Sequence, residues 1–554
     1  MAKMTRITQE MAEDYRARGY WGTLRTSEIW DNNALYYPDK EALVDARKRL
    51  TYAQIKLLSD RFAYWLLRAG FRKDEVLVMQ LPNCVESFIV RLGCEKAGIL
   101  CATTQMNLRY KEMEAACEKL EAAAVIIPWN FGGTDYYEMM KEIQQRVPTI
   151  RKIVVLGDRV PAGEYSLEAI LNEPLEKEFP ADALEKTRFG MDEVAVIGLT
   201  SGTSGVPKLV EHPILARIAV GKAYGDSVQL GRDDTLALVT NSILGGAASV
   251  GYSGGAALAG ARVVLLERWN VEDALRLLER EQVTVLRIVP TQLIMILTHP
   301  DLKKYRLSLR AVLCGSAPLP WEMAREADRS LGVRIVTSYG SFDGALFSLS
   351  TIDQPDEVRW KTSGCPPAGT EVRIVDDGGK EVPAGEIGEL IGRGALTTSG
   401  HFGDVDATVQ AWGSLGREGW FKTGDLARFD EEGNLSIVGR KKDMVLRGGQ
   451  NIYPQEIENL LLTHPKVKQV AVIGMPDPVM GERACAYIAP KAGDTFTFDE
   501  MTSFLRQHRI ASFKIPERME IRESLPIGEL GKVMKPQLIE DIRRKLQAEG
   551  HQEG

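Results

Sequence analysis

Residues 194–208 read Val194-Ala-Val-Ile-Gly-Leu-Thr-Ser-Gly-Thr-Ser-Gly-Val-Pro-Lys208, an apolar run followed by a loop of small and hydroxyl-bearing residues. The run from Val194 to Leu199 is typical of a buried strand. The loop has four hydroxyl side chains, backbone N–H groups and one ammonium, which together can surround an anion. It lacks the Gly-Lys-Ser/Thr ending of a Walker A loop, and a polar surface loop is the alternative. We predict a different kind of phosphate-binding loop, formed by Thr200, Ser201, Gly202, Thr203, Ser204, Gly205 and Lys208.

Strand-like and helix-like segments alternate on both sides of this loop. Short apolar runs that predict buried strands are Val76 to Leu81, Val263 to Leu266, Val283 to Val289 and Ala311 to Leu313. Helical periodicity follows some of these runs, as in Cys84 to Lys96 and Val271 to Glu281. This alternation predicts an α/β fold, a large N-terminal body of parallel or mixed sheets with packed helices.

The pattern changes after about residue 365. Glu371 to Val375, an Asp-Asp-Gly-Gly turn and Ile387 to Ile391 predict an antiparallel hairpin, so we expect a β-rich subdomain over about 365–440. Beyond the charged run 440–443, helix-like and strand-like segments predict a small α+β domain over 444–554. The predicted organisation is therefore a domain over 1–440, a junction at 441–443 and a C-terminal domain.

Composition excludes several classes of protein. The 554 residues include 76 Asp and Glu against 69 Lys and Arg, which gives a net charge of −7. The protein therefore has no overall positive field that would attract nucleic acid. The seven cysteines lack Cys-x-x-Cys pairs, so reduced thiols are expected and a zinc site is not. No signal-peptide core or long apolar run is visible, which predicts a cytoplasmic protein without membrane insertion.

The segment from Gly245 to Ala261 is unusually rich in small residues. A membrane helix is one interpretation, but the segment is short and only weakly apolar, which favours a buried helix of a soluble protein. Glycine disfavours helices, so we expect these glycines to allow a close approach to a backbone or a ligand.

Five motifs, in order, resemble the adenylate-forming superfamily of acyl-CoA synthetases, peptide-synthetase adenylation domains and luciferases. They are the 200–208 loop, Ser338-Tyr-Gly-Ser-Phe-Asp343, Phe421-Lys-Thr-Gly-Asp425, Gly439-Arg-Lys-Lys-Asp443, and the segment from Leu525 to Lys532. The segment Tyr15 to Trp21 is similar to the start of aryl-acid–AMP ligases. The likeness spans nearly the whole chain.

The resemblance implies a role for each motif. It implies that Lys532 is catalytic, that Asp343 helps to hold Mg²⁺ and that Lys442 is the pivot of a mobile C-terminal lid. It implies that ATP and AMP contact the 200–208 loop, Gly315, Ser316, Ala317, Ser338, Tyr339, Gly340, Ser341, Asp425 and Arg440. Gly448 and Gly449 would line a thiol tunnel, and Asn241, Ser242, Gly245 and Gly246 would line the acyl pocket.

The chain departs from the family pattern at the phosphate end. Leu209 stands where glycine is common, Phe342 where threonine is common, and Asp343 replaces glutamate. The phosphate contact of that threonine is therefore in question. The segment 240–244 carries no histidine, so the His-Asn pair of dihydroxybenzoate activators is not evident.

The resemblance implies an AMP-forming carboxylate–CoA ligase that uses ATP, Mg²⁺ and coenzyme A. Small residues at 245–248 favour a bulky uncharged acid, aromatic, alicyclic or medium-chain, over acetate. One alternative is an aryl-acid–AMP ligase that loads a carrier-protein phosphopantetheine, and another is a catalytically silent nucleotide-binding module. The acid, the acceptor, the direction of the reaction and the oligomeric state, with a homodimer among the alternatives, stay open.

Overall fold

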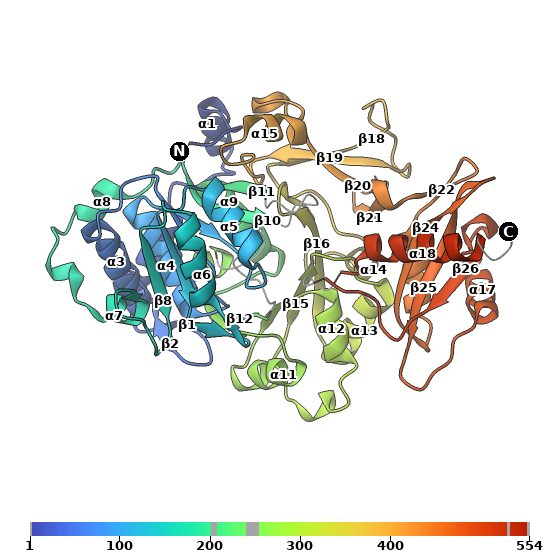
Figure 1. Cartoon of the computed structure of the whole chain (residues 1–554), viewed down its shortest axis with the longest axis horizontal. Helices are drawn as coiled ribbons and strands as arrows, with labels where there is room; N and C mark the ends of the chain where they lie inside the picture. The colour runs from blue at the N-terminus through green and yellow to red at the C-terminus, as the bar shows by residue number, and fades with distance from the viewer. Residues whose placement is uncertain (1–2, 201–207, 240–253, 529–531, 551–554) are drawn as a thin grey trace.

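The computed structural model describes residues 3–200, 208–239, 254–528 and 532–550. Two large sheets form the N-terminal body, a smaller antiparallel sheet adjoins them, and a further sheet with three helices forms the C-terminal part at one end of the long axis (Figure 1). The expected α/β body with a β-rich subdomain and a small α+β C-terminal part is confirmed. Among the described residues, no helix combines the length and apolar content needed to cross a bilayer.

The seven-stranded sheet contains the strand that precedes the phosphate-binding loop. Its order is β11 (Lys208–Pro213), β10 (Val194–Thr200), β4 (Leu100–Thr103), β3 (Val76–Met79), β5 (Ala124–Pro128), β8 (Lys152–Leu156) and β9 (Tyr165–Ser166). All neighbours are parallel except β10 and β11, which form an antiparallel pair across residues 201–207. The predicted strand at Val194 to Leu199 is therefore confirmed.

The eight-stranded sheet is parallel except at its two edges. Its order is β17 (Ala345–Leu349), β16 (Arg334–Ser341), β15 (Ala311–Gly315), β14 (Val285–Ile288), β12 (Thr235–Leu238), β13 (Arg262–Leu265), β1 (Glu41–Val44) and β2 (Arg49–Thr51). Its central strands are continuous buried runs, as expected for a sheet that is covered on both faces. Because the parallel strands share one direction, their carboxyl ends bring Gly315 and Ser338 side by side.

The N-terminal body has helices on and around both large sheets. They are α1 (Gln9–Ala17), α2 (Thr26–Tyr36), α3 (Tyr52–Arg68), α4 (Val85–Ala97), α5 (Tyr110–Lys119), α6 (Tyr136–Arg146), α7 (Leu167–Asn172), α8 (Ala183–Thr187), α9 (Ile214–Ser227), α11 (Val271–Arg280), α12 (Pro290–Leu297), α13 (Trp321–Leu331) and α14 (Asp356–Lys361). Helix α9 contacts β10 and β11 of one sheet and β17 of the other. It therefore lies in a helix layer between the two sheets.

The small-residue segment is described only from residue 254. Residues 254–259 are helical and most of them are buried, in agreement with the predicted buried helix. A Cβ atom added at Gly255 would lie 2.4 Å from the main-chain oxygen of Gly221 in α9. The expected close approach to a backbone is therefore confirmed at this glycine.

The smaller sheets follow in sequence. The four-stranded antiparallel sheet contains β18 (Thr370–Val375), β19 (Gly388–Gly394), β20 (Phe421–Phe429) and β21 (Leu435–Arg440), with α15 (Val405–Trp412) beside it. The C-terminal part contains β22 (Val445–Arg447), β23 (Gln450–Ile452), β24 (Val467–Asp477), β25 (Gly481–Pro490) and β26 (Arg518–Ile521) with α16 (Pro454–Leu462), α17 (Phe498–Gln507) and α18 (Lys535–Gly550).

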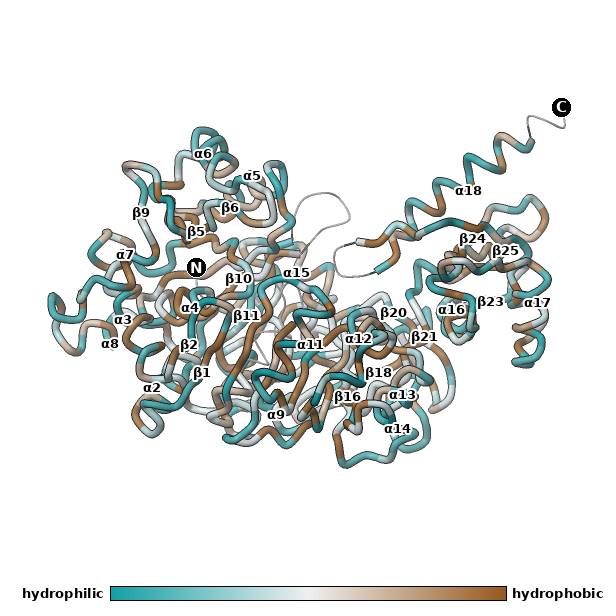
Figure 2. Tube along the Cα trace, turned by 90° about the horizontal axis from the view of Figure 1, so that it is seen from below, coloured by the Kyte–Doolittle hydropathy of each residue, from teal (hydrophilic) through white to brown (hydrophobic). Residues whose placement is uncertain are grey.

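The C-terminal part has hydrophobic clusters of its own. Two clusters of buried side chains consist only of residues from Val445 onward, on the two faces of the β24–β25 pair. Figure 2 shows this part beside the body, with α18, which packs on β24, leading to the C-terminus. Such separate packing is what a movable domain requires, because movement then leaves both cores intact.

Candidate active site

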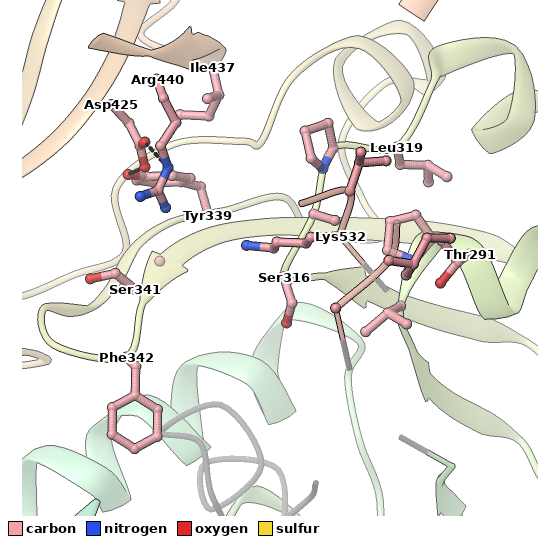
Figure 3. Close-up of a pocket in the computed structure, with 18 of the residues that line it drawn as sticks. Thr291, Ser316, Leu319, Tyr339, Ser341, Phe342, Asp425, Ile437, Arg440 and Lys532 are labelled. Atoms are coloured by element: carbon pink, nitrogen blue, oxygen red, sulfur yellow. Dashed lines mark hydrogen bonds and ion pairs between the residues drawn. The ribbon is translucent and has the colours of Figure 1, made fainter. Parts of the chain in front are cut away.

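A cleft of about 2590 Å³ lies where the two large sheets, the four-stranded sheet and the C-terminal part meet. Segments that are far apart in the sequence converge on it (Figure 3). The predicted site residues that line it are Lys208, Ser316, Ala317, Ser338, Tyr339, Gly340, Ser341, Asp343, Asp425, Arg440, Lys442 and Lys532. The fold therefore gathers in one place twelve of the sixteen predicted site residues that the structure describes.

Asp425 is the centre of a polar cluster at one wall of the cleft. It lies on β20 opposite Arg440 of β21, and the Arg440 Nε is 3.0 Å from its Oδ1. The Tyr339 hydroxyl donates to Asp425 Oδ2 at 2.5 Å, and Thr423 Oγ1 accepts from the Asp425 N–H at 3.0 Å. Burial, together with the Asp425 carboxylate, raises the pKa of Tyr339 well above its usual value. The Asp425 carboxylate is thus oriented by donors from two sheets.

Lys532 projects into the cleft from the segment between β26 and α18. Figure 3 shows its side chain between the Asp425 cluster and Ser316. The side chain is exposed to the cleft, and desolvation by the surrounding protein lowers its pKa, as does Arg440, whereas Asp425 raises it. Lys532 is therefore a cation placed within electrostatic reach of both charged groups of the opposite wall.

Lys208 and Asp343 mark the other end of the cleft. The Lys208 Nζ lies 3.4 Å from Asp343 Oδ2, and the Thr398 hydroxyl donates to the main-chain oxygen of Asp343. The Ser341 Oγ accepts from the Gly344 N–H at 2.9 Å, which closes the turn that carries Asp343. One ammonium and one carboxylate therefore face each other at the end of the predicted phosphate-binding loop.

Phe342 points away from this polar group. Its ring packs on Gly198, where an added Cβ atom would lie 2.3 Å from the ring, and it meets His212 edge-on at 5.3 Å between ring centroids. Figure 3 shows Phe342 turned away from Ser341 and the Asp425 cluster. The aromatic side chain is therefore a packing group at a position where the family commonly has a hydroxyl.

The β15–β16 edge shows a strained backbone beside a buried cation. Ser316 has a φ of 78°, which is rare for a residue with a side chain, and a Cβ atom at Gly315 would lie 2.8 Å from Ser338 Oγ. The Arg287 Nη2 donates to Ser316 Oγ at 3.1 Å. Arg287 is not among the residues predicted from the sequence, where a cationic residue within the apolar run 283–289 was the available signal.

The remaining predicted residues lie at the junction and beyond it. Lys441 pairs with Glu389 and Asp377, each at 2.9 Å, while its neighbour Lys442 lines the cleft. Gly448 and Gly449 form the turn between β22 and β23 with φ values of 54° and 83°. Neither glycine is among the described residues that line the cleft, so this arrangement does not bring them to the nucleotide motifs.

Several predicted residues cannot be placed in the cleft. Thr200 ends β10, where its Cα pairs with that of Lys208. Other predicted residues lie outside the described part of the chain, namely Ser201, Gly202, Thr203, Ser204, Gly205, Asn241, Ser242, Gly245 and Gly246.

The chain is similar to known ligases over nearly its full length. It is 32% identical over 539 residues to the medium-chain fatty-acid–CoA ligase of Escherichia coli K12, covering 96% of this chain and 93% of that protein. It is 31% identical over 550 residues to the 2,3-dihydroxybenzoate-AMP ligase of Bacillus subtilis 168, covering 97% of each. The relatives therefore include both a CoA ligase and an AMP ligase.

Solved structures support the fold. The anthranilate CoA ligase AuaEII, in complex with anthranoyl-AMP, superposes with a TM-score of 0.83 at 23% identity, covering 95% of this chain and 98% of that one. The AMP-binding enzyme family model matches residues 30–402, and the AMP-binding enzyme C-terminal domain model matches residues 456–532. The chain belongs to the AMP-binding enzyme family, the adenylate-forming enzymes that the five motifs resemble.

Proposed function

We propose that the protein is an AMP-forming carboxylate–CoA ligase for an aromatic, alicyclic or medium-chain acid. The convergence of Lys532, Asp425, Arg440 and Asp343 on one cleft is the observation that supports it most strongly. Family membership supports the use of ATP. A carboxylate is a poor acyl donor until one of its oxygens becomes part of a good leaving group, and adenylation achieves this.

In the first half-reaction, a carboxylate oxygen would attack the α-phosphorus of ATP, and the bond from that phosphorus to the departing pyrophosphate would break. The Asp425 carboxylate is an acceptor-only group suited to the ribose hydroxyls, and Tyr339 and Arg440 hold it in place. Lys532 would neutralise charge that develops between the carboxylate and the α-phosphate. Positioning and charge neutralisation suffice for such in-line transfer.

Asp343 fits a magnesium ion that is bound mainly through nucleotide phosphates. In such sites one or two carboxylates complete the coordination, and no larger cluster of carboxylate, histidine or cysteine ligands occurs in the described ranges. Asp343 is partly exposed to the cleft and already faces the Lys208 ammonium, so the phosphate end combines an oxygen ligand with a cation. Bound there, Mg²⁺ would offset phosphate charge.

In the second half-reaction, the thiol of coenzyme A would attack the acyl carbonyl and release AMP. We propose that the C-terminal part, 444–554, rotates about 441–443, withdraws Lys532 and brings the Gly448–Gly449 turn to the cleft. Its separate hydrophobic clusters are compatible with such a movement. Aryl-acid transfer to a carrier-protein phosphopantetheine is the second candidate, favoured by the similarity to a 2,3-dihydroxybenzoate-AMP ligase.

A panel of acids should separate these candidates. We expect octanoate, benzoate or cyclohexanecarboxylate to release pyrophosphate faster than acetate, and free coenzyme A to be converted to a thioester at saturating acid. Pyrophosphate release and acyl-CoA are measured together for each acid. A preference for acetate would contradict the acid class, and thioester formation only on a carrier protein would favour the second candidate.

The pH dependence of adenylation should depend on Lys532. Lys532 can neutralise negative charge only in its protonated form. Burial and Arg440 lower its pKa below that of an ordinary lysine. The kcat/KM for adenylation should therefore be constant at low pH and fall as pH rises through this lowered value. Arginine stays charged across that range, so Lys532→Arg should remove the alkaline fall from whatever activity it retains. An identical alkaline fall in both proteins would assign the titration to another group.

A further inference from the structure

His401 is a buried imidazole on the wall of the cleft, and neither of its ring nitrogens has a hydrogen-bond partner. The residue is 5% exposed and lines the cleft, and its Nδ1 and Nε2 meet no donor or acceptor among the residues that the structure describes. Buried polar atoms in folded proteins are paired with few exceptions, and each exception needs an explanation of its own. His401 lies outside the five motifs, so the proposed function does not yet explain it.

Strand pairing determines on which face of the sheet this side chain lies. His401 pairs with Val210 of β11, and main-chain hydrogen bonds of 2.9 and 2.8 Å join residues 400 and 402 to the residues on either side of Val210. In such a non-hydrogen-bonded antiparallel pair, the two side chains lie close together on one face. Lys208 and His212 share that face, because alternate residues of a strand point to the same side.

This face of β11 adjoins the phosphate end of the cleft. The Lys208 Nζ lies 3.4 Å from the Asp343 carboxylate. The hydroxyl of Thr398, three residues before His401, donates to the main-chain oxygen of Asp343. His401 therefore lies beside the turn that carries Asp343 and on the edge of the strand that follows the predicted phosphate-binding loop.

The charged groups around His401 are already balanced in pairs. Lys208 faces Asp343, and the Lys119 Nζ lies 3.5 Å from Asp404 Oδ2. Burial lowers the pKa of His401 below its usual value, while the two carboxylates raise it and the two ammonium groups lower it. The ring is therefore neutral near pH 7. A neutral imidazole has one N–H donor and one acceptor.

A phosphate oxygen is a better partner for this N–H than a metal ion. Mg²⁺ prefers oxygen ligands, and in the part of the chain that the structure describes no three His, Cys, Asp or Glu side chains are arranged to hold a metal. Phe342 stands where the family commonly has a threonine whose hydroxyl contacts a phosphate, so the 338–343 turn lacks that donor. His401 offers an N–H donor from the neighbouring segment at the same end of the cleft.

We propose that His401 binds the β- and γ-phosphates of ATP through a ring N–H and so holds the pyrophosphate that leaves during adenylation. This role rests on the proposed function, and it helps to keep the leaving group in line with the attacking carboxylate. Neither ring nitrogen is open to solvent in the arrangement described, so the wall must adjust as the nucleotide binds. Hydrogen bonds in active sites often tighten only when the substrate is bound.

Calorimetric titration of the full chain with ATP, AMP and inorganic pyrophosphate, each in the presence of Mg²⁺, tests this role. His401→Phe keeps a ring of similar size and removes both nitrogens. Its affinity for ATP and pyrophosphate should fall about 10–100-fold, the usual cost of one hydrogen bond to a charged group. AMP lacks the β- and γ-phosphates, so its affinity should change less than about twofold. A merely structural effect on the cleft would weaken ATP and AMP alike.

Two amide variants and one control complete the set. His401→Asn and His401→Gln return an N–H near the positions of Nδ1 and Nε2, and at least one of them should bind ATP at least about threefold more tightly than His401→Phe. His508→Phe is the control, because His508 is exposed and is not among the described residues that line the cleft. It should bind ATP like the wild type.

An equal loss of affinity for ATP and AMP, no loss in His401→Phe, or no regain in either amide variant would overturn the proposal. Octanoate-dependent ATP–pyrophosphate exchange, measured in parallel, separates this role from the ligase function. The ATP-selective losses without any exchange in the wild type support the role of His401 and refute the ligase function. Exchange in the wild type with unchanged selectivity in His401→Phe refutes the role of His401 alone, and a wild type that binds no nucleotide refutes both.

Discussion

Replacing Lys532 by alanine should lower acid-dependent ATP–pyrophosphate exchange by about 10²–10³-fold, the usual effect of removing one group that stabilises transition-state charge. The ammonium lies in the cleft between the Asp425 cluster and Ser316, and this variant removes it without touching the core. Conversion of supplied acyl-adenylate to acyl-CoA should change less than about threefold, because the proposed second half-reaction proceeds with Lys532 withdrawn from the cleft.

Lys535→Ala is the control for the loss of a cation from the same segment. Lys535 also lines the cleft, but its Nζ pairs with Glu458 at 2.8 Å. We expect it to retain most of the exchange activity. If Lys532→Ala reduced both half-reactions equally, the proposal that Lys532 acts only in adenylation, and is withdrawn for thioester formation, would be wrong.

Asp425→Asn should weaken ATP binding by about 10–100-fold, the expected cost of losing charged hydrogen bonds to the ribose hydroxyls. The asparagine is of nearly the same size, so the packing of β20 is preserved, and calorimetric titration measures the loss directly. The difference in affinity between ATP and 2′-deoxyATP should also be smaller in the variant, because the carboxylate that accepts a hydrogen bond from the 2′-hydroxyl is absent.

Tyr339→Phe measures the contribution of the hydroxyl that positions the Asp425 carboxylate, apart from that of the carboxylate itself. This variant removes the hydroxyl that donates to Asp425 Oδ2 and leaves the carboxylate paired with Arg440. Its effect on ATP affinity should be smaller than tenfold.

If Asp425→Asn bound ATP and 2′-deoxyATP with the same relative affinities as the wild type, Asp425 would not be the ribose ligand.

Sequence patterns predicted the layers of the fold because strand and helix periodicities are local. The buried run before Thr200 and the antiparallel segments after residue 365 each occupy the predicted kind of sheet. The placement of Ser316, Ser338 and Tyr339 in the cleft follows from parallel strands that end at one edge. Motif order, together with this topology, was sufficient to predict that these segments lie together at one cleft.

The interactions within the site were not predictable from the sequence. The bond from Tyr339 to Asp425 joins residues 86 positions apart, and the pair formed by Lys208 and Asp343 spans 135 positions. Such contacts depend on how two sheets pack, which no local pattern encodes. Arg287 illustrates the same point, since only the tertiary structure places a strand residue against Ser316.

The most direct test of the central claim follows the oxygen of the acid. The wild type is incubated with ATP, coenzyme A and an acid labelled with ¹⁸O in its carboxylate, and the products are analysed by mass spectrometry. If the carboxylate attacks the α-phosphorus, one labelled oxygen becomes bonded to that phosphorus. The thiol then breaks the bond between this oxygen and the acyl carbon, so AMP should carry one ¹⁸O and pyrophosphate none. Unlabelled AMP, or label in an inorganic phosphate released together with ADP, would contradict the formation of an acyl-adenylate.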